Sequence, residues 1–495
     1  MRFSNVLLAA GFFNATFAQH NATSSVAFRS ALRTCSLLQK SLGSEIVQTS
    51  GTEYQASASG AWSLFNAEDL PPCIVFPRST QHVQVAMAAI FRDKIRYAVQ
   101  AGGHSAMTGW NSVQDGILIF FSHMQNVTYD PTSDTITLQP GIHWGDALSQ
   151  LSPLGVAPLG GRLGDIGTGL LLGGGLSYLS GEFGFSSNAF VELDVVLVTG
   201  KLVTATATNQ YSDLFRALKG GANRFGIVTR YQVKAIHIGT EDDKNFFGGV
   251  ILYPNSSAEA LINATAKYVS TVNDTKASIL MAFTNSVNGS EINSSHILTL
   301  FYHGSSLPNI FGDFLSIPSS FSQIGPVSYM DANSILGAGG DRGFGQLFGA
   351  SAFKGGVVEQ YANAFRAWTD YTNTIESALF ATVLAFTPII DAQTLAGRAN
   401  GGNLMDPPRG NYAAVQIQTQ MLAGVATVPT FVTTARNKLF SRIPRSAGFP
   451  LYINECDAGQ NVFATYGKFN ELKTTYAKYD PTRFNIRFSD GPIGL

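Results

Sequence analysis

The sequence predicts an α+β fold divided into more than one domain, and three observations support this. The chain has 495 residues, 45% of them apolar, which is more than one ordinary hydrophobic core accommodates. Short strand and helix patterns alternate up to about residue 239, as in a layered domain. From 240 to 447, longer apolar runs with intervening helical stretches indicate an antiparallel sheet backed by helices.

The expected elements follow from apolar periodicity and from the turn residues between them. In the first part, the expected strands are 73–75, 95–100, 116–120, 126–130, 135–138, 193–198 and 202–206, and the helices are 79–92, 144–151 and 213–218. In the second part, the expected strands are 246–253, 278–284, 297–302, 379–387 and 412–421, and the helices are 257–273 and 355–377.

Charge and cysteine content exclude several function classes. The formal net charge is -1 and lysine and arginine do not cluster, so we expect no nucleic-acid partner. The three cysteines form no CxxC or Cys/His pattern, so we expect no metal site. Cys35 and Cys73 can pair in an oxidising compartment, which leaves Cys456 as a small buried apolar residue.

The N-terminus predicts secretion. Residues 1–18 combine a basic Arg2, a short apolar run and small residues before Ala18, which is typical of a signal peptide; the alternative is a buried first helix. The apolar run is too short to span a bilayer, so we expect no membrane anchor. Seven Asn-X-Ser/Thr sequons support the secretory route. They are Asn21, Asn126, Asn255, Asn263, Asn273, Asn288 and Asn293.

Three glycine-rich loops carry the chemistry of the first part. The first follows strand 95–100 and contains Gly102, Gly103, His104, Ser105 and Gly109. The second spans 160–175 and precedes an expected helix at 176–180, and the third spans 220–228. Such loops let backbone N–H groups approach an anion. A Rossmann dinucleotide turn fits poorly, because no β-branched strand precedes residue 160.

In this order, the loops resemble the FAD-binding domain of the vanillyl-alcohol oxidase and p-cresol methylhydroxylase superfamily, most closely its berberine-bridge-enzyme-like branch. The resemblance includes the Pro77-X-Ser79 turn and a C-terminal stretch at 451–481. It implies an N-terminal segment (19–67), an FAD-binding domain (68–239), a substrate domain (240–447) and a C-terminal return to the FAD domain (448–495). The FAD-binding residues that it implies are Ser79, Gly102, Gly103, His104, Ser105, Gly109, Gly167, Gly169, Gly173, Gly174, Gly226, Ile227, Val228 and Asn454.

The resemblance also implies that His104 is bonded covalently to the flavin 8α-methyl carbon. A neutral imidazole is a competent nucleophile near pH 7, and the bond should raise the flavin potential. The alternative is that His104 only hydrogen-bonds the loop or a phosphate. Relatives often make a second link through a cysteine, but that position is Leu163 here, so we expect a single link.

The C-terminal stretch departs from the family pattern at the residue that acts as the catalytic base in relatives. Relatives usually have Tyr-X-Asn-Tyr, whereas this chain has Tyr452-Ile453-Asn454-Glu455. A carboxyl held in an apolar site can have its pKa raised toward neutrality, so Glu455 is the expected general base or acid. Alternatively, Glu455 is solvated or ion-paired and Tyr452 or Tyr412 acts instead.

The resulting functional prediction is a secreted, monomeric FAD-dependent oxidase that acts on a small organic molecule with O2 as electron acceptor. By resemblance, Trp62-Ser63 and the single link are similar to fungal secreted enzymes of secondary metabolism. One alternative is a redox-neutral isomerase or cyclase on a flavin scaffold with Glu455 as proton shuttle. Another is a carbohydrate oxidase.

Overall fold

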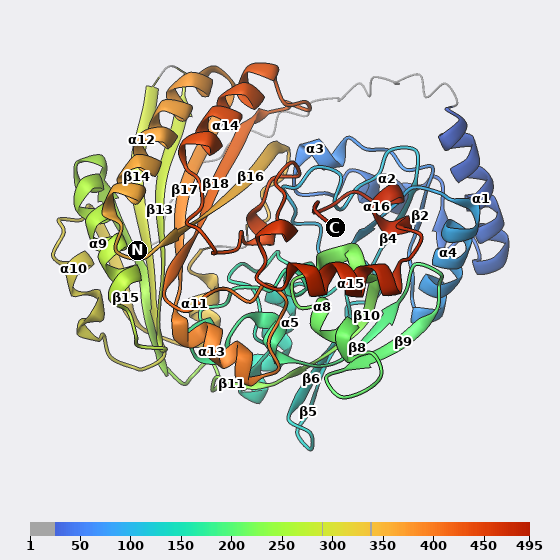
Figure 1. Cartoon of the computed structure of the whole chain (residues 1–495), viewed down its shortest axis with the longest axis horizontal. Helices are drawn as coiled ribbons and strands as arrows, with labels where there is room; N and C mark the ends of the chain where they lie inside the picture. Colours follow the sequence, from blue (N-terminus) through green and yellow to red (C-terminus); the bar gives the residue numbers. More distant parts are fainter. Residues whose placement is uncertain (1–24, 290, 337–338) are drawn as a thin grey trace.

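Two α+β parts pack side by side in the computed structural model, which describes residues 25–289, 291–336 and 339–495 (Figure 1). The fold class expected from the sequence is therefore confirmed. The expected signal peptide and the Asn21 sequon lie outside the described residues.

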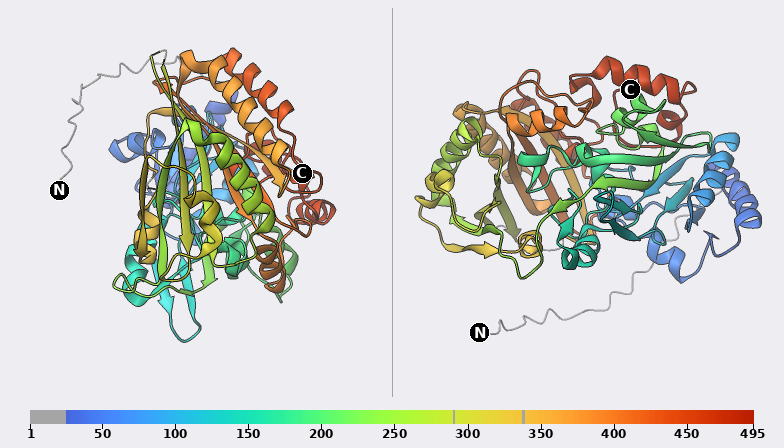
Figure 2. Two further views of the ribbon diagram at one scale, coloured as in Figure 1. Left: turned by 90° about the vertical axis from the view of Figure 1, so that its left-hand side faces the viewer. Right: turned by 90° about the horizontal axis from the view of Figure 1, so that it is seen from below.

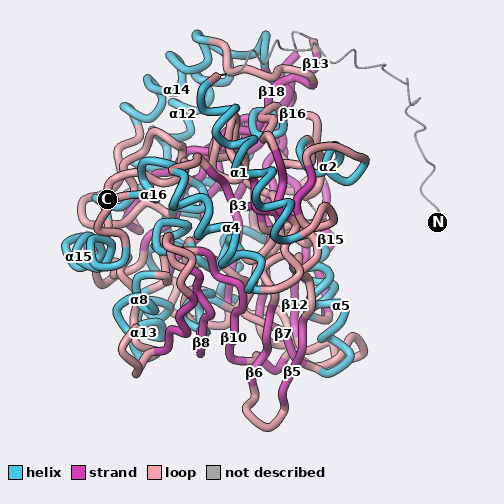
Figure 3. Tube along the Cα trace, turned by 90° about the vertical axis from the view of Figure 1, so that its right-hand side faces the viewer, coloured by secondary structure: helices cyan, strands magenta, loops and turns pink. Residues whose placement is uncertain are grey.

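The first sheet has four strands, in the order β1 (Val47–Gln48), β2 (Cys73–Val75), β4 (Ile117–Phe120) and β3 (Tyr97–Gln100). The last three run parallel and β1 is antiparallel to β2. Helices α1 (Val26–Leu42) and α4 (Thr80–Asp93) pack together beside this sheet (Figure 3). A Cys35–Cys73 disulfide joins α1 to β2. Residues 25–67 thus pack with the first domain, because their strand β1 completes the sheet.

The second sheet is antiparallel, in the order β5 (Val127–Asp130), β6 (Thr135–Leu138), β10 (Ile227–Lys234), β8 (Phe190–Val196) and β9 (Leu202–Thr206). Helices α5 (Trp144–Leu151) and α8 (Ser212–Ala217) contribute Trp144, Leu148, Leu214 and Phe215 to the hydrophobic core beside it.

The third sheet forms the second part of the molecule and has seven antiparallel strands. Their order is β15 (Phe321–Val327), β12 (Phe246–Pro254), β14 (Glu291–Tyr302), β13 (Ala277–Asn288), β17 (Leu379–Ile389), β18 (Tyr412–Ala423) and β16 (Phe344–Lys354). Helices α9 (Ala258–Thr271), α12 (Val358–Ile375) and α14 (Thr430–Arg442) cover its outer face (Figure 2). The sequence missed β15, which is a largely exposed edge strand, and β16, whose glycines and alanines weaken the strand pattern.

The C-terminal segment returns to the first part. Helix α15 (Phe469–Tyr479) packs on α8, where Lys478 Nζ lies 2.6 Å from an Asp213 carboxylate oxygen and Tyr479 Oη donates to the other oxygen at 2.7 Å. Helix α16 (Phe484–Phe488) follows, and Phe484 enters the core of the first sheet. Other short elements include α2 (Thr52–Ala58), α3 (Leu64–Ala67), β7 (Val156–Ala157), β11 (Ile236–His237), α10 (Gly312–Leu315), α11 (Tyr329–Ser334) and α13 (Asp391–Ala399).

The last glycines of the second cluster follow the end of a helix, whereas the sequence predicted that a helix begins after them. Helix α6 (Gly169–Leu172) stops at Gly173, and residues 176–179 are not helical before α7 (Ser180–Phe183). Gly174 and Gly175 have φ of 103° and 78°, a left-handed conformation that interrupts a right-handed helix. The expected helix at 176–180 is therefore wrong.

The structure shows that the described sequon asparagines are accessible at the surface, and it shows nothing further about glycosylation. All six described sequon asparagines are exposed, and five of them belong to the substrate part. Whether they carry glycans stays a prediction. No helix within the described ranges is long and apolar enough to cross a bilayer.

Candidate active site

A cavity of about 490 Å³ lies between the glycine loops of the first part and the inner face of the seven-stranded sheet. The first two loops line it with 101–105 and 166–170, the third with 226–228, and the C-terminal segment with Tyr452, Asn454 and Glu455. Pockets of this size commonly hold a cofactor or a small ligand.

His104 lies in the wall of this cavity, where a stacked ring and a hydrogen bond fix its orientation. Its ring stacks on Trp62 with centroids 4.0 Å apart and an angle of 14° between planes. Its Nε2 lies 3.1 Å from the Gly339 carbonyl oxygen, as for a donated hydrogen bond. Burial lowers the pKa of His104, and the nearby Asp165 opposes this effect. The imidazole is therefore held neutral at pH 7.

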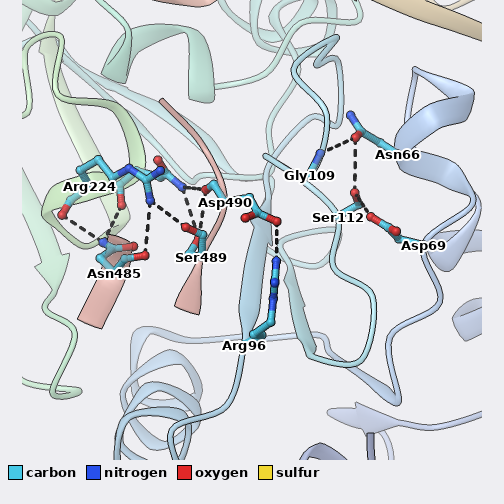
Figure 4. A network of polar contacts seen from close by, with 10 residues as sticks. Asn66, Asp69, Arg96, Gly109, Ser112, Arg224, Asn485, Ser489 and Asp490 are labelled. Carbon is cyan, nitrogen blue, oxygen red and sulfur yellow. Dashed lines mark hydrogen bonds and ion pairs between the residues drawn. The ribbon is translucent and has the colours of Figure 1, made fainter. Parts of the chain in front are cut away.

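Asn66 and Asn111 hold the loop that carries His104. Asn66 Nδ2 donates to the carbonyls of Ser105 (3.1 Å) and Met107 (3.2 Å), while its Oδ1 accepts from the Gly109 N–H at 2.8 Å. Asn111 Nδ2 donates to the Gly103 carbonyl at 2.8 Å. Figure 4 shows Asn66 and Gly109 within this network. Gly109 thus supports the loop from behind and does not itself line the cavity.

The first and second loops touch through two glycines. A Cβ atom at Gly102 would lie 2.7 Å from the Gly167 nitrogen, and one at Gly167 would lie 2.6 Å from the Gly102 nitrogen. Any side chain at either position would push the two backbones apart. This contact explains why both positions are glycine, and it lets both loops present backbone to the same cavity.

Glu455 is a buried carboxyl group at the cavity surface. It ends the short 3-10 turn Ile453–Glu455 and is 8% exposed. Burial raises the pKa of Glu455 to about 7, although the nearby Arg162 guanidinium lowers it. Within the described part of the chain, no group hydrogen-bonds its carboxyl oxygens. The side chain is therefore free to exchange a proton with a bound molecule.

Tyr452 and Asn454 lie beside Glu455 and are held more tightly. Asn454 Nδ2 donates to Tyr452 Oη at 2.9 Å and to the Leu170 carbonyl at 3.0 Å. Gly173 packs against Asn454, since a Cβ there would lie 2.0 Å from Asn454 Oδ1. Burial raises the pKa of Tyr452, with Glu455 adding to the effect. Tyr452 is thus a weak acid that remains protonated, whereas Glu455 titrates near neutrality.

The comparisons with known proteins agree with this geometry. Residues 71–206 match the model of an FAD binding domain. An uncharacterized FAD-linked oxidoreductase of Arthroderma benhamiae is 30% identical over 471 residues, which cover 89% of this chain and 91% of that protein. An FAD-dependent monooxygenase of Arthrobotrys oligospora is 29% identical, covering 91% and 87%. The chain belongs to the FAD-linked oxidoreductases.

Solved structures confirm the fold of this FAD-linked oxidoreductase. A xylooligosaccharide oxidase of Myceliophthora thermophila, in complex with xylobiose, superposes with a TM-score of 0.72 at 19% identity, covering 95% of this chain and all of that one. The 6-hydroxy-D-nicotine oxidase of Arthrobacter nicotinovorans gives 0.71 at 16%, covering 88% and 95%. At these identities the likeness establishes the fold alone.

The lining residues of the oxidoreductase fit FAD. Arg162 is the sole arginine or lysine among the described residues that line the cavity, so a pyrophosphate would be met by backbone N–H groups of the glycine loops. Asn111 Oδ1 and Asn223 Oδ1 are buried without a hydrogen-bond partner in the described structure, and both residues line the cavity. Such acceptors suit the hydroxyl and amino donors of a dinucleotide.

Several residues expected at the cofactor lie outside the cavity. Ser79 precedes α4, and that helix is tied to β10 through a 3.0 Å hydrogen bond between Thr80 Oγ1 and Thr229 Oγ1. Gly173 and Gly174 pack against Asn454 and Met405. These positions shape the walls and do not line the cavity. Tyr412, the other alternative base, is buried against Phe449 and likewise does not line it.

Part of the site was not predicted from the sequence. Trp62 and Arg162 were not assigned a role, and neither was a group of glutamines on the substrate sheet. Gln416, Gln418 and Gln420 alternate along β18 and all line the cavity, which is the period-2 signal that a strand face produces. Gln418 Nε2 donates to Gln346 Oε1 on β16 at 3.2 Å. The alternation of the glutamines is visible in the sequence, but the sequence does not show which face of the seven-stranded sheet borders the cavity.

Proposed function

We propose that this protein is a secreted oxidase that holds FAD through one covalent bond to His104 and oxidises a small neutral molecule. The observation that supports it best is Glu455, a buried carboxyl with a pKa of about 7 in the same cavity as His104. A group that accepts a proton at neutral pH is what oxidation of a C–H or O–H bond requires.

The single attachment rests on His104 and Leu163. Because Nε2 is engaged with the Gly339 carbonyl, the neutral ring leaves the Nδ1 lone pair as its nucleophile. Leu163 lines the cavity at the position where relatives carry a second linking residue, and its side chain cannot form that bond. Bound FAD would supply a hydride acceptor at N5 and pass the electrons to O2.

Glu455 would move the proton. In its ionised form, the carboxylate would take a proton from the substrate, and the apolar surroundings that raise its pKa also make it a stronger base than an exposed glutamate. Arg162 would limit this effect and keep part of the population ionised at neutral pH. Tyr452, fixed by Asn454, would hold the substrate and would not titrate.

The glutamine group favours a neutral substrate. Gln346, Gln416, Gln418 and Gln420 offer amide donors and acceptors beside the apolar Phe348. Amides pair with hydroxyl and carbonyl groups without needing a charge, which suits a hydroxylated metabolite or a carbohydrate. The fungal relatives named as FAD-dependent monooxygenases support a place in secondary metabolism, while the xylooligosaccharide oxidase keeps a carbohydrate substrate as the alternative.

A redox-neutral isomerase or cyclase is the second candidate, and Glu455 is the observation that favours it. A carboxyl that titrates near pH 7 can donate a proton as readily as accept one, unlike a tyrosine. Anaerobic mixing with substrate separates the two candidates. An oxidase loses its flavin absorbance and consumes O2 when air is admitted, whereas an isomerase turns over with neither change.

The covalent link is tested by acid precipitation. Wild-type protein should keep its yellow flavin in the pellet, and His104→Ala should release it. His237→Ala, a change at an exposed histidine on β11, is the matched control and should behave as wild type. Release of flavin from the wild-type protein would contradict the proposed link.

A further inference from the structure

We propose that the C-terminal tail, residues 485–495, is part of the cofactor site and closes the end of the cavity that takes the adenylate half of FAD. The proposal rests on the FAD site of the proposed function but not on the covalent bond or the reaction. The resemblance places residues 448–495 with the FAD domain, but its quoted motif ends at Pro481 and the matched FAD binding domain ends at 206, so neither assigns a cofactor contact to this tail.

The residues that line the cavity distinguish two ends. Trp62, His104 and the glutamines of β18 lie at the end that faces the substrate sheet. Tyr97, Ile227 and Ser489 line it among the strands of the first part. If the flavin ring lies at His104, the rest of the dinucleotide extends toward Ser489, because FAD is an elongated molecule with its adenylate opposite the ring.

Arg224 fixes the tail to the third glycine loop. Arg224 is 3% exposed, and its guanidinium donates to three tail carbonyls: Pro492 (2.9 Å), Ser489 (2.8 Å) and Asn485 (3.3 Å). Figure 4 shows the contacts of Arg224 with Asn485 and Ser489. Arg224 lies two residues before the lining residues 226–228, and Ser489 of the tail also lines the cavity, so the loop and the tail form one wall.

Asn223 and Asn485 extend this wall to the cofactor space. Asn223 Nδ2 donates to the Asp490 carbonyl at 3.0 Å, which leaves its buried Oδ1 without a partner among the described residues. Asn485 Nδ2 donates to the Asn223 carbonyl at 2.9 Å, and its Oδ1 accepts from Tyr97 Oη at 3.1 Å. An adenylate offers the ribose hydroxyl and amino donors that the Asn223 oxygen lacks.

Asp490 connects the tail to the histidine loop. Its carboxylate lies 2.6 Å from Arg96 Nη2, and it packs over Gly109, where a Cβ would lie 2.9 Å from Asp490 Oδ2 (Figure 4). Gly109 in turn is held by Asn66, which supports the loop of His104. The tail therefore contacts the loop that carries His104 as well as the third glycine loop.

The test uses apo protein carrying His104→Ala, in which flavin binds reversibly, and compares FAD with FMN, which lacks the adenylate. Flavin fluorescence titrations give both dissociation constants. The parent should bind FAD at least tenfold more tightly than FMN. Adding Ser489→Phe, which places a ring at the adenylate end, should remove this preference while leaving FMN binding within twofold. Ile493→Phe, a tail change at a 43% exposed residue outside the cavity, should keep it.

Two results would overturn the proposal: a parent without preference for FAD, or Ser489→Phe protein that retains it. If Ser489→Phe fails to fold by circular dichroism, Asn223→Ala replaces it, and the FAD preference should then fall at least threefold. Failure of the covalent link would appear separately, as acid-released flavin from wild-type protein. In that case the titrations are made in the wild-type background.

Discussion

Replacing Glu455 with glutamine should change how the stability of the protein depends on pH. Burial raises the pKa of this carboxyl from 4.5 to about 7 on folding. Between these two values the folded state binds more protons than the unfolded state, so the free energy of unfolding falls as pH rises. At about 1.4 kcal/mol per tenfold change in proton affinity, the loss above pH 7 is roughly 3 kcal/mol.

Glu455→Gln is neutral at every pH and lacks this loss. Urea unfolding of both proteins in the same flavin state, from pH 4.5 to 8, should therefore show the variant gaining roughly 3 kcal/mol relative to wild type as pH rises. Other titrating groups cancel in the difference. Glu376→Gln, at an exposed glutamate, is the matched control and should give a flat difference.

Removing Arg162 should raise the pKa of Glu455 further. Because its guanidinium lowers the pKa of Glu455, Arg162→Gln should move the stability loss and the pH–rate profile toward higher pH. Parallel pH–stability curves for wild type and Glu455→Gln would refute the reasoning, since they would mean that Glu455 has the same pKa in both states.

Three further outcomes are expected. The double variant Cys35→Ser/Cys73→Ser opens a crosslink with a sequence separation of 38 residues, so denaturant titration should show a loss of about 4 kcal/mol; an unchanged midpoint would show that the crosslink contributes nothing. Gly167→Ala should separate the two glycine loops and reduce flavin content per chain, while Gly325→Ala on β15, away from the cavity and with nothing within 4 Å of its Cβ, should not; equal flavin in both would refute the tight-contact explanation. Protein secreted from a fungal host should lose mass on enzymatic deglycosylation, and an unchanged mass would contradict the use of the sequons.

The sequence by itself determined the local chemistry. Gly102, Gly103 and His104 follow a buried strand, and Glu455 stands where relatives carry a tyrosine. The proposed flavin attachment residue and the proposed proton acceptor could therefore be named from the order and spacing of residues. The strands at 73–75 and 135–138 and the helix at 144–151 were also predicted with their exact bounds. Each of these features depends on short-range periodicity or on turn residues, which are written locally in the chain.

Only the tertiary structure decided which of these residues share one cavity. The Gly102–Gly167 contact, the Trp62–His104 stack and the burial of Glu455 join segments far apart in sequence. Ser79 and Gly109 match the family motif but lie behind the wall, because a motif records proximity along the chain and not the direction in which a loop faces. The pKa of Glu455 likewise depends on desolvation by distant elements, which no local pattern encodes.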